Sequence, residues 1–309
     1  MGITIGANMN KRIKATIACL ISIFILTGCT SFTEAELTGK TVGYDTSKIK
    51  KVPDIAELLP KEIKDKKVLR IGTSAGYAPS VFFADDGKTI IGYDNDVAQA
   101  IANVLGIKKT LSHTPFDNLL PSVGSKFDVA IGGFTITKDR IKKENMISYV
   151  KAGSMFAVAK GNPKKISTKN LCGTTMGVQI GTYQMQDVPR LSKECVKKGK
   201  KPIELAPYDL QSKIVPTLIG LKVDVMYADS PVVGYAIQKT DHRIQQLGDI
   251  FDETLNGIVV DKKNNQLALA IQKATQYLID NGTLEKIMDK WGVKDVVLKK
   301  SEINPKVKN

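Results

Sequence analysis

Short apolar runs alternate with amphipathic segments along most of this chain of 309 residues. The run at 68–73 predicts a strand, and residues 96–105 predict a helix because their apolar members recur every three or four positions. A strand at 110–112, a helix at 116–123 and a strand at 127–132 follow. This βαβαβ order predicts a largely parallel sheet with helices on its faces.

The same order begins again after residue 159. Strands are expected at 176–179, 203–205 and 223–227, and helices from Thr182 toward Cys195, at 209–219 and from Ser230. A strand at 257–260 and helices at 264–281 and 283–291 then end the chain. Because these elements follow a complete second unit, we expect the chain to return to the first one. The predicted fold class is α/β, with two lobes joined by a two-strand hinge near 157–162 and 251–256.

A ligand cleft is expected between the two lobes, because open α/β sheets bind ligands beyond the carboxyl ends of their strands. Segments 132–135, 179–182 and 228–229 lie at such ends. One of them comes from the first lobe and two come from the second, so they would face each other.

Arg140 occupies an unusual place for a cation. Thr137 resembles a helix N-cap and Asp139 lies in the first turn, but Arg140 shares that turn with the positive end of the helix dipole. Either its side chain points into solvent, or an anion lies between the guanidinium and the helix end.

The N-terminus has the features of a secretory signal. Basic residues at 11–14 precede an apolar stretch at 15–25, which is too short to span a bilayer comfortably, and either Met1 or Met9 can be the start. Leu26-Thr27-Gly28-Cys29 resembles the bacterial lipobox, which implies a lipid on Cys29; the alternative is an ordinary secreted protein with a coincidental cysteine. We therefore expect a signal peptide at 1–28 and a tether at 29–66, with one short helix near 55–59.

Composition limits the partners. The formal net charge is +14, yet the lysines are scattered and not interleaved with aromatic residues, so no nucleic-acid partner is expected. Cys172 and Cys195 remain after the signal peptide and the lipid site are set aside, and two such thiols outside the cytoplasm usually pair. His113 and His242 are the only histidines and neither lies near a CxxC spacing, so no metal is expected.

Several motifs together resemble the extracytoplasmic solute-binding proteins of polar amino-acid ABC transporters, whose fold is the type II periplasmic binding protein fold. The motifs are 72–79 (GTSAGYAP), 92–97 (GYDNDV), 133–140 (GFTITKDR), 177–182 (GVQIGT), 224–231 (DVMYADSP), 280–287 (DNGTLEKI) and 290–292 (KWG). The resemblance implies a first lobe at 67–156 and 257–309 and a second lobe at 157–256, closing on a free L-amino acid. It also implies a monomer without cofactor, held by lipid on the outer face of the bacterial cytoplasmic membrane, that delivers its ligand to a permease.

The resemblance also implies a ligand-binding set. In it, Arg140 and the Thr182 N–H hold the ligand carboxylate, and Asp229 accepts from the ammonium. The Thr135 hydroxyl and the Gly133 backbone contact the carboxylate and ammonium end of the ligand. Tyr77 and Phe116 match positions whose rings sandwich the ligand side chain, although they could be ordinary core aromatics. The full expected set is Ser74, Tyr77, Phe116, Gly133, Phe134, Thr135, Arg140, Gln179, Gly181, Thr182, Gln184 and Asp229.

The sequence says less about which side chain the ligand carries. No acid stands at Ser74 or Val81, where binders of cationic amino acids often place one, and no cation stands at Gln179 to favour glutamate. These residues favour a neutral polar amino acid such as glutamine. Asp94 and Asp96 are interpreted as structural, one capping the helix at 96–105, and Trp291 as a core residue.

Two other functions stay open. An enzyme on the same fold, such as a dehydratase or a cell-wall lyase, would need a general acid over its substrate. Asp229 is the acid available, and an ammonium already occupies it in the binding interpretation, so no catalytic residue is expected. An amino-acid-sensing lipoprotein without a transporter is the second alternative.

Overall fold

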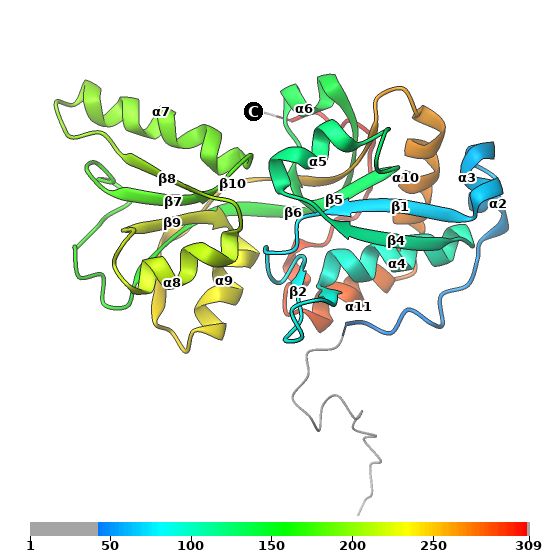
Figure 1. The fold of residues 1–309 in the computed structure, drawn as a ribbon, viewed down its shortest axis with the longest axis horizontal. Coiled ribbons are helices and arrows are strands. Elements are labelled where there is room, and N and C mark those ends of the chain that lie inside the picture. Colours follow the sequence, from blue (N-terminus) through cyan, green and yellow to red (C-terminus); the bar gives the residue numbers. More distant parts are fainter. Residues whose placement is uncertain (1–42, 308–309) are drawn as a thin grey trace, which may run out of the picture. The chain divides into compact units, whose positions relative to one another are not determined.

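The structure is a computed structural model that describes residues 43–307. In this part of the chain, eight strands form one sheet in the order β4-β1-β5-β10-β6-β9-β7-β8. The strands are β1 (Val68–Thr73), β4 (Lys108–His113), β5 (Val129–Thr135), β6 (Glu144–Ala159), β7 (Thr175–Gln179), β8 (Glu204–Tyr208), β9 (Val225–Asp229) and β10 (Ile244–Asp261), and a separate hairpin pairs β2 (Phe82–Phe83) with β3 (Ile90–Ile91). The long strands β6 and β10 pair antiparallel in the middle of the sheet and join its two halves (Figure 1).

The helices fall into two groups, one packed with each half of the sheet. We call β1, β4 and β5 with their helices the first lobe, and β7, β8 and β9 with theirs the second lobe. First-lobe helices are α2 (Pro53–Ala56), α3 (Lys61–Lys66), α4 (Tyr93–Leu105), α5 (Phe116–Ser122), α6 (Lys138–Lys143), α10 (Asn265–Asp280), α11 (Thr283–Lys290) and the 3-10 turn η2 (Lys294–Val296). Second-lobe helices are α7 (Tyr183–Lys197), η1 (Gln211–Lys213), α8 (Ile214–Ile219) and α9 (Ser230–Lys239).

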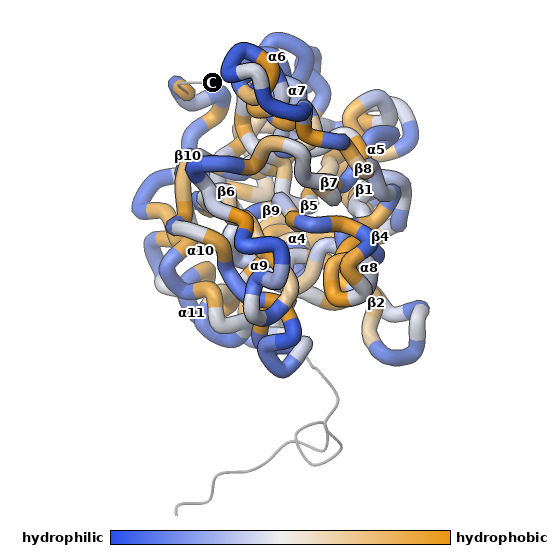
Figure 2. The backbone as a smooth tube through the Cα atoms, turned by 90° about the vertical axis from the view of Figure 1, so that its left-hand side faces the viewer, coloured by the Kyte–Doolittle hydropathy of each residue, from blue (hydrophilic) through white to orange (hydrophobic). Residues whose placement is uncertain are grey.

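Each lobe buries apolar side chains on both faces of the sheet. In β6, Met155 and Ala157 pack in the cluster under α8 and α9, whereas Phe156 and Val158 pack in the cluster under α7. Alternate residues of a strand point to opposite faces, so one strand contributes to two cores. Burying one such large side chain contributes roughly 1.5–3 kcal/mol. Figure 2 shows the hydrophobic residues gathered in the inner strands and the hydrophilic ones on the outer turns.

Asp94 and Asp96 do not cap α4, so that prediction is wrong. The helix begins after Gly92, whose φ of +124° suits glycine, and no side chain caps it. Asp94 instead accepts hydrogen bonds from Tyr149 Oη at 2.6 Å and from Ser80 Oγ. Asp96 accepts from Trp291 Nε1 at 2.7 Å, which holds this buried tryptophan in the first-lobe core as expected.

Part of the expected tether packs against the first lobe. Residues 43–66 form α2 and α3 where one helix was expected near 55–59, and Leu59 and Ile63 are buried in the lobe's core. The Val52 N–H also donates to Val104 O at 2.9 Å. Apolar residues of this segment complete the core, because α4 and α10 leave room for them. The expected signal peptide at 1–28 and Cys29 lie outside the described residues.

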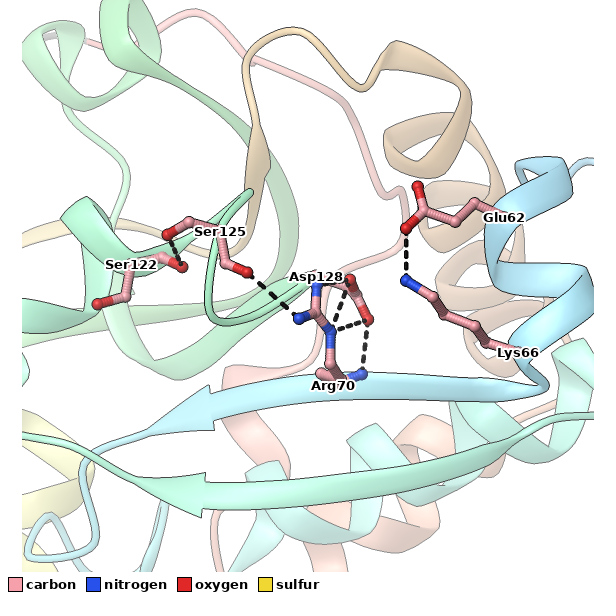
Figure 3. A network of polar contacts seen from close by, with 6 residues as sticks. All are labelled: Glu62, Lys66, Arg70, Ser122, Ser125 and Asp128. Carbon is pink, nitrogen blue, oxygen red and sulfur yellow. Dashed lines mark hydrogen bonds and ion pairs between the residues drawn. The ribbon is translucent and has the colours of Figure 1, made fainter.

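An ion pair in the first lobe and a disulfide bond in the second stabilise the lobes away from the carboxyl ends of the strands. Arg70 of β1 donates from Nη2 to Asp128 Oδ1 at 2.6 Å, and its Nη1 donates to Ser125 O at 3.2 Å (Figure 3). In the second lobe a disulfide joins Cys172 to Cys195, as predicted, and fixes the loop before β7 to the end of α7.

Candidate functional site

The candidate site lies where strands of both lobes end. Thr73 ends β1 and Thr135 ends β5 in the first lobe, whereas Gln179 ends β7 and Asp229 ends β9 in the second. Within each lobe these strands are parallel neighbours, so their carboxyl ends meet at one edge. Contacts between the lobes hold these two edges close together.

The guanidinium of Arg140 is buried at the entrance of α6. Thr137 caps this helix, because its hydroxyl accepts from Arg140 N at 3.2 Å, and the Arg140 residue is 7% exposed. Nη1 donates to Thr135 O at 2.7 Å and Nη2 donates across the lobes to Gly181 O at 3.1 Å. The solvent alternative for this side chain is therefore wrong.

The charge of Arg140 has little compensation. Desolvation lowers its pKa from the ordinary range of arginine to about 10, although the nearby Asp229 carboxylate opposes the shift. Among the described residues no carboxylate lies within ion-pair distance of it. Phe116 and Phe134 stack with centroids 4.6 Å apart, and their rings lie 5.8 and 5.7 Å from the guanidinium carbon. This geometry gives a cation–π contribution but no counter-charge.

Asp229 is the buried carboxylate on the other side. Gln184 Nε2 donates to its Oδ1 at 2.7 Å, and Asn256 Nδ2 donates to its Oδ2 at 3.3 Å. Its backbone N–H donates to Tyr77 Oη, which belongs to the first lobe, at 3.2 Å. Burial raises the pKa of Asp229, whereas hydrogen bonds from Gln184, Asn256 and Tyr77 and the charge of Arg140 lower it.

Gly133 lets β5 end close to this carboxylate. Its φ is +69°, and a Cβ atom there would lie 3.0 Å from Tyr77 Cε1 and 3.7 Å from Asp229 Oδ2. A larger residue would therefore strain the backbone and push against the Tyr77 ring. The sequence places this glycine where the backbone can reach the space between the lobes.

The remaining predicted residues line the second-lobe side. Thr182 caps α7: its hydroxyl accepts from Met185 N at 3.1 Å and donates to Gln179 O at 2.7 Å. The Thr182 N–H also bonds to Gln179 O, at 3.4 Å. Gln179 Nε2 donates to Asp209 O at 3.2 Å and reaches Ser74 Oγ of the first lobe at 3.5 Å. The structure thus connects all twelve predicted residues by contacts or by chain adjacency.

Three residues of this region were not predicted. Asn256 and Ser154 lie on the long strands β10 and β6, and Ser154 Oγ accepts from Gln184 Nε2 at 3.4 Å. Asp94 lies behind Gly133; burial raises its pKa to about 7, and hydrogen bonds from Ser80, Tyr149 and the Gly133 backbone oppose the shift. A polar residue opening the apolar run at 257–260 was the available signal for Asn256.

The chain is similar to known proteins along most of its length. A family model described as "Bacterial extracellular solute-binding proteins, family 3" matches residues 69–294. The chain belongs to this family. It is 30% identical over 296 residues to the arginine-binding protein ArgT of Corynebacterium glutamicum, covering 95% of this chain and 96% of the relative. It is 29% identical over 243 residues to the L-cystine-binding protein TcyJ of Escherichia coli, covering 78% and 88%.

Solved structures of family members share the fold. An ancestral arginine-binding protein bound to arginine superposes with a TM-score of 0.67 at 32% identity, covering 73% of this chain and 98% of the relative, and it has also been solved with glutamine. The predicted fold, two α/β lobes of the type II periplasmic binding protein kind, is confirmed. The family is extracellular, and no helix within residues 43–307 is long and apolar enough to cross a bilayer.

Proposed function

We propose that this protein binds a free L-α-amino acid between its two lobes and delivers it to the permease of an ABC transporter. One observation carries the proposal: Arg140 of the first lobe and Asp229 of the second are both buried, oppositely charged and near each other without forming an ion pair. An α-amino acid carries a carboxylate and an ammonium on adjacent positions, so it complements both charges at once. Relatives named for arginine and for L-cystine support this ligand class.

Each end of the zwitterion has a matching partner. The carboxylate binds the Arg140 guanidinium in bidentate form, with the Thr135 hydroxyl and the Thr182 N–H at the start of α7 as further donors, and the Gly133 backbone contacts the ammonium end. The ammonium binds Asp229. Tyr77, Phe116 and Phe134 supply the aromatic walls, and Ser74, Gln179, Gly181 and Gln184 complete the site.

The neutral character of these walls favours a neutral polar ligand such as glutamine. Arg140 and Asp229 balance each other and the two charges of the zwitterion, so a charged ligand side chain would need another partner. Ser74, Gln179 and Gln184 supply only neutral groups. Arginine is the second candidate, because ArgT and the ancestral arginine-binding protein are named for it.

The lobes act as a clamp on a lipid anchor. The first lobe comprises 67–156 and 257–309, together with the packed helices α2 and α3, and the second comprises 157–256; the two close about the hinge when ligand binds. A lipid on Cys29 holds the monomer at the outer face of the cytoplasmic membrane. The Cys29→Ala protein should then partition into the soluble fraction. A wild-type N-terminal peptide without the added mass of a lipid would contradict lipidation.

Binding without turnover is the expected activity. Asp229 would be held by the ammonium and by Gln184 and Asn256, which leaves it unsuited to proton transfer. The experiment that tests the function is a thermal-shift screen of the twenty amino acids and L-cystine, followed by calorimetry and product analysis. We expect one ligand class to raise the melting temperature and to be recovered unchanged. A lack of any shift would refute amino-acid binding, and a new product would favour the enzyme alternative. Uptake that persists after deletion of the gene would favour the sensor alternative.

A further inference from the structure

Asn256 carries a buried acceptor that no described group satisfies. The residue is 1% exposed and its Oδ1 has no hydrogen-bond partner, whereas its Nδ2 donates to Asp229 Oδ2 at 3.3 Å. Leaving such a carbonyl unpaired is costly, because the group has lost its water without gaining a donor. A donor supplied at this point by a ligand would remove that cost.

The orientation of the Asn256 amide follows from its neighbour. The ionised Asp229 carboxylate only accepts hydrogen bonds, so the amide nitrogen must face it and the oxygen must be the free atom. The oxygen and nitrogen of one amide lie about 2.2 Å apart by covalent geometry. Asn256 Oδ1 therefore lies within about 5.5 Å of Asp229 Oδ2, and one ammonium nitrogen can lie within hydrogen-bond distance of both.

Asn256 also has a distinctive place in the sheet. It stands on β10 opposite Thr135 on one side and Val150 of β6 on the other. Thr135 O holds the Arg140 guanidinium, and Asp229 belongs to the second lobe. Asn256 is therefore the point at which the strand that joins the lobes meets the proposed ligand space.

We infer that Asn256 is a specificity residue whose Oδ1 accepts a hydrogen bond from the ligand's α-ammonium beside Asp229. This inference rests on the proposed amino-acid function and adds a second acceptor to the ammonium subsite. A primary ammonium has three N–H groups and can serve both acceptors, whereas an N,N-dimethylated one has a single N–H group and can serve only one of them. The residue thus selects unmodified α-amino groups and couples their binding to the joining strand.

The test is a double cycle of protein and ligand changes measured by calorimetry. The probe is the tightest binder among L-glutamine, L-arginine, L-histidine and L-cystine, with its α-N,N-dimethyl form. Asn256→Leu keeps the branched shape of the side chain and removes both polar atoms, and Asn256→Ala controls for the larger size of leucine. Asn170→Ala removes an exposed asparagine whose side-chain oxygen accepts from Lys200, and it serves as the matched control.

We expect each Asn256 variant to lose about 10- to 100-fold in affinity for the primary amine, the range for a hydrogen bond to a charged group. N,N-dimethylation should cost the wild type a similar factor more than it costs the variants, so that the two changes are not additive. Additive losses, or variants that bind like wild type and Asn170→Ala, would overturn the inference while leaving the proposed function intact. A wild type that binds neither L-cystine nor any of the twenty amino acids would overturn both.

Discussion

Replacing one arginine should separate binding from folding in this protein. Arg140→Met keeps an unbranched, flexible side chain and removes its charge, whereas Arg70→Met removes a cation of the same type from a place away from the carboxyl ends of the strands. Arg70 has a carboxylate partner, Asp128, which raises the pKa of its guanidinium. Arg140 has only backbone carbonyls, and burial lowers its pKa.

The magnitudes follow from these environments. Burial lowers the Arg140 pKa to about 10, so that the site disfavours its charge by ~3 kcal/mol even after the opposing attraction of Asp229. Its two bonds to carbonyls, at roughly 1.5–3 kcal/mol each, offset that cost. Arg140→Met should therefore change the free energy of unfolding of ligand-free protein by less than ~2 kcal/mol. Binding should fall by roughly 2–5 kcal/mol, at least ~30-fold, because the ligand carboxylate loses its buried counter-charge.

Urea unfolding and calorimetry together decide the matter. Arg70→Met should lose about 1 kcal/mol of stability, since its pair is partly exposed, and should bind ligand like wild type. The reasoning fails if Arg140→Met is folded and binds within threefold of wild type. It also fails if Arg140→Met unfolds the protein and Arg70→Met weakens binding, because the two arginines would then have exchanged roles.

Three further changes probe the same structure. Cys172→Ala with Cys195→Ala should cost ~3 kcal/mol of unfolding free energy, because the bond closes a loop across 23 positions; urea titration measures this, and an unchanged midpoint would refute it. Burial raises the Asp94 pKa to about 7, so the folded state holds the proton more tightly than the unfolded state does. The contribution of this carboxyl to the free energy of unfolding therefore falls as pH rises from about 4 to 7. Asp94→Asn should reduce that fall by up to ~4 kcal/mol, and an unaltered dependence of the unfolding free energy on pH would contradict it. Gly181→Ala places a Cβ 3.0 Å from Asp117 of the opposite lobe and should weaken ligand-induced compaction in small-angle scattering, unlike Gly199→Ala, whose Cβ meets nothing within 4 Å.

Much of the fold could be predicted because its local patterns are strong. Thr137 and Thr182 cap α6 and α7 through their hydroxyls, as their positions before helical runs indicate. The apolar runs that end at Thr73 and Gln179 are strands, because each is bounded by polar or glycine-rich segments. The strand-end segments 132–135, 179–182 and 228–229 follow from the same patterns, since strand ends in an α/β sheet mark where ligands bind. The individual residues of the proposed site came from the resemblance to the family.

The long joining strands could not be predicted in full. Only 257–260 was expected from β10, because 244–256 is a half-exposed stretch with polar residues on both faces and no alternation. Its pairing with β6 comes from contacts far apart in the sequence, which periodicity does not reveal. Asn256 was missed for this reason, and the bonds of Asp94 to Ser80 and Tyr149 are likewise long-range.

The two charges of the site connect ligand binding with the closeness of the lobes. Arg140 reaches Gly181 O across the lobes, and Tyr77 of the first lobe accepts from the backbone of Asp229 in the second. Bringing these groups together removes water from both charges, which is unfavourable while neither has an ionic partner. A zwitterion supplies both partners and so favours the closed arrangement over an open one. Under the proposed function, Arg140 and Asp229 would set both the affinity for the amino acid and the equilibrium between open and closed lobes through the same desolvation.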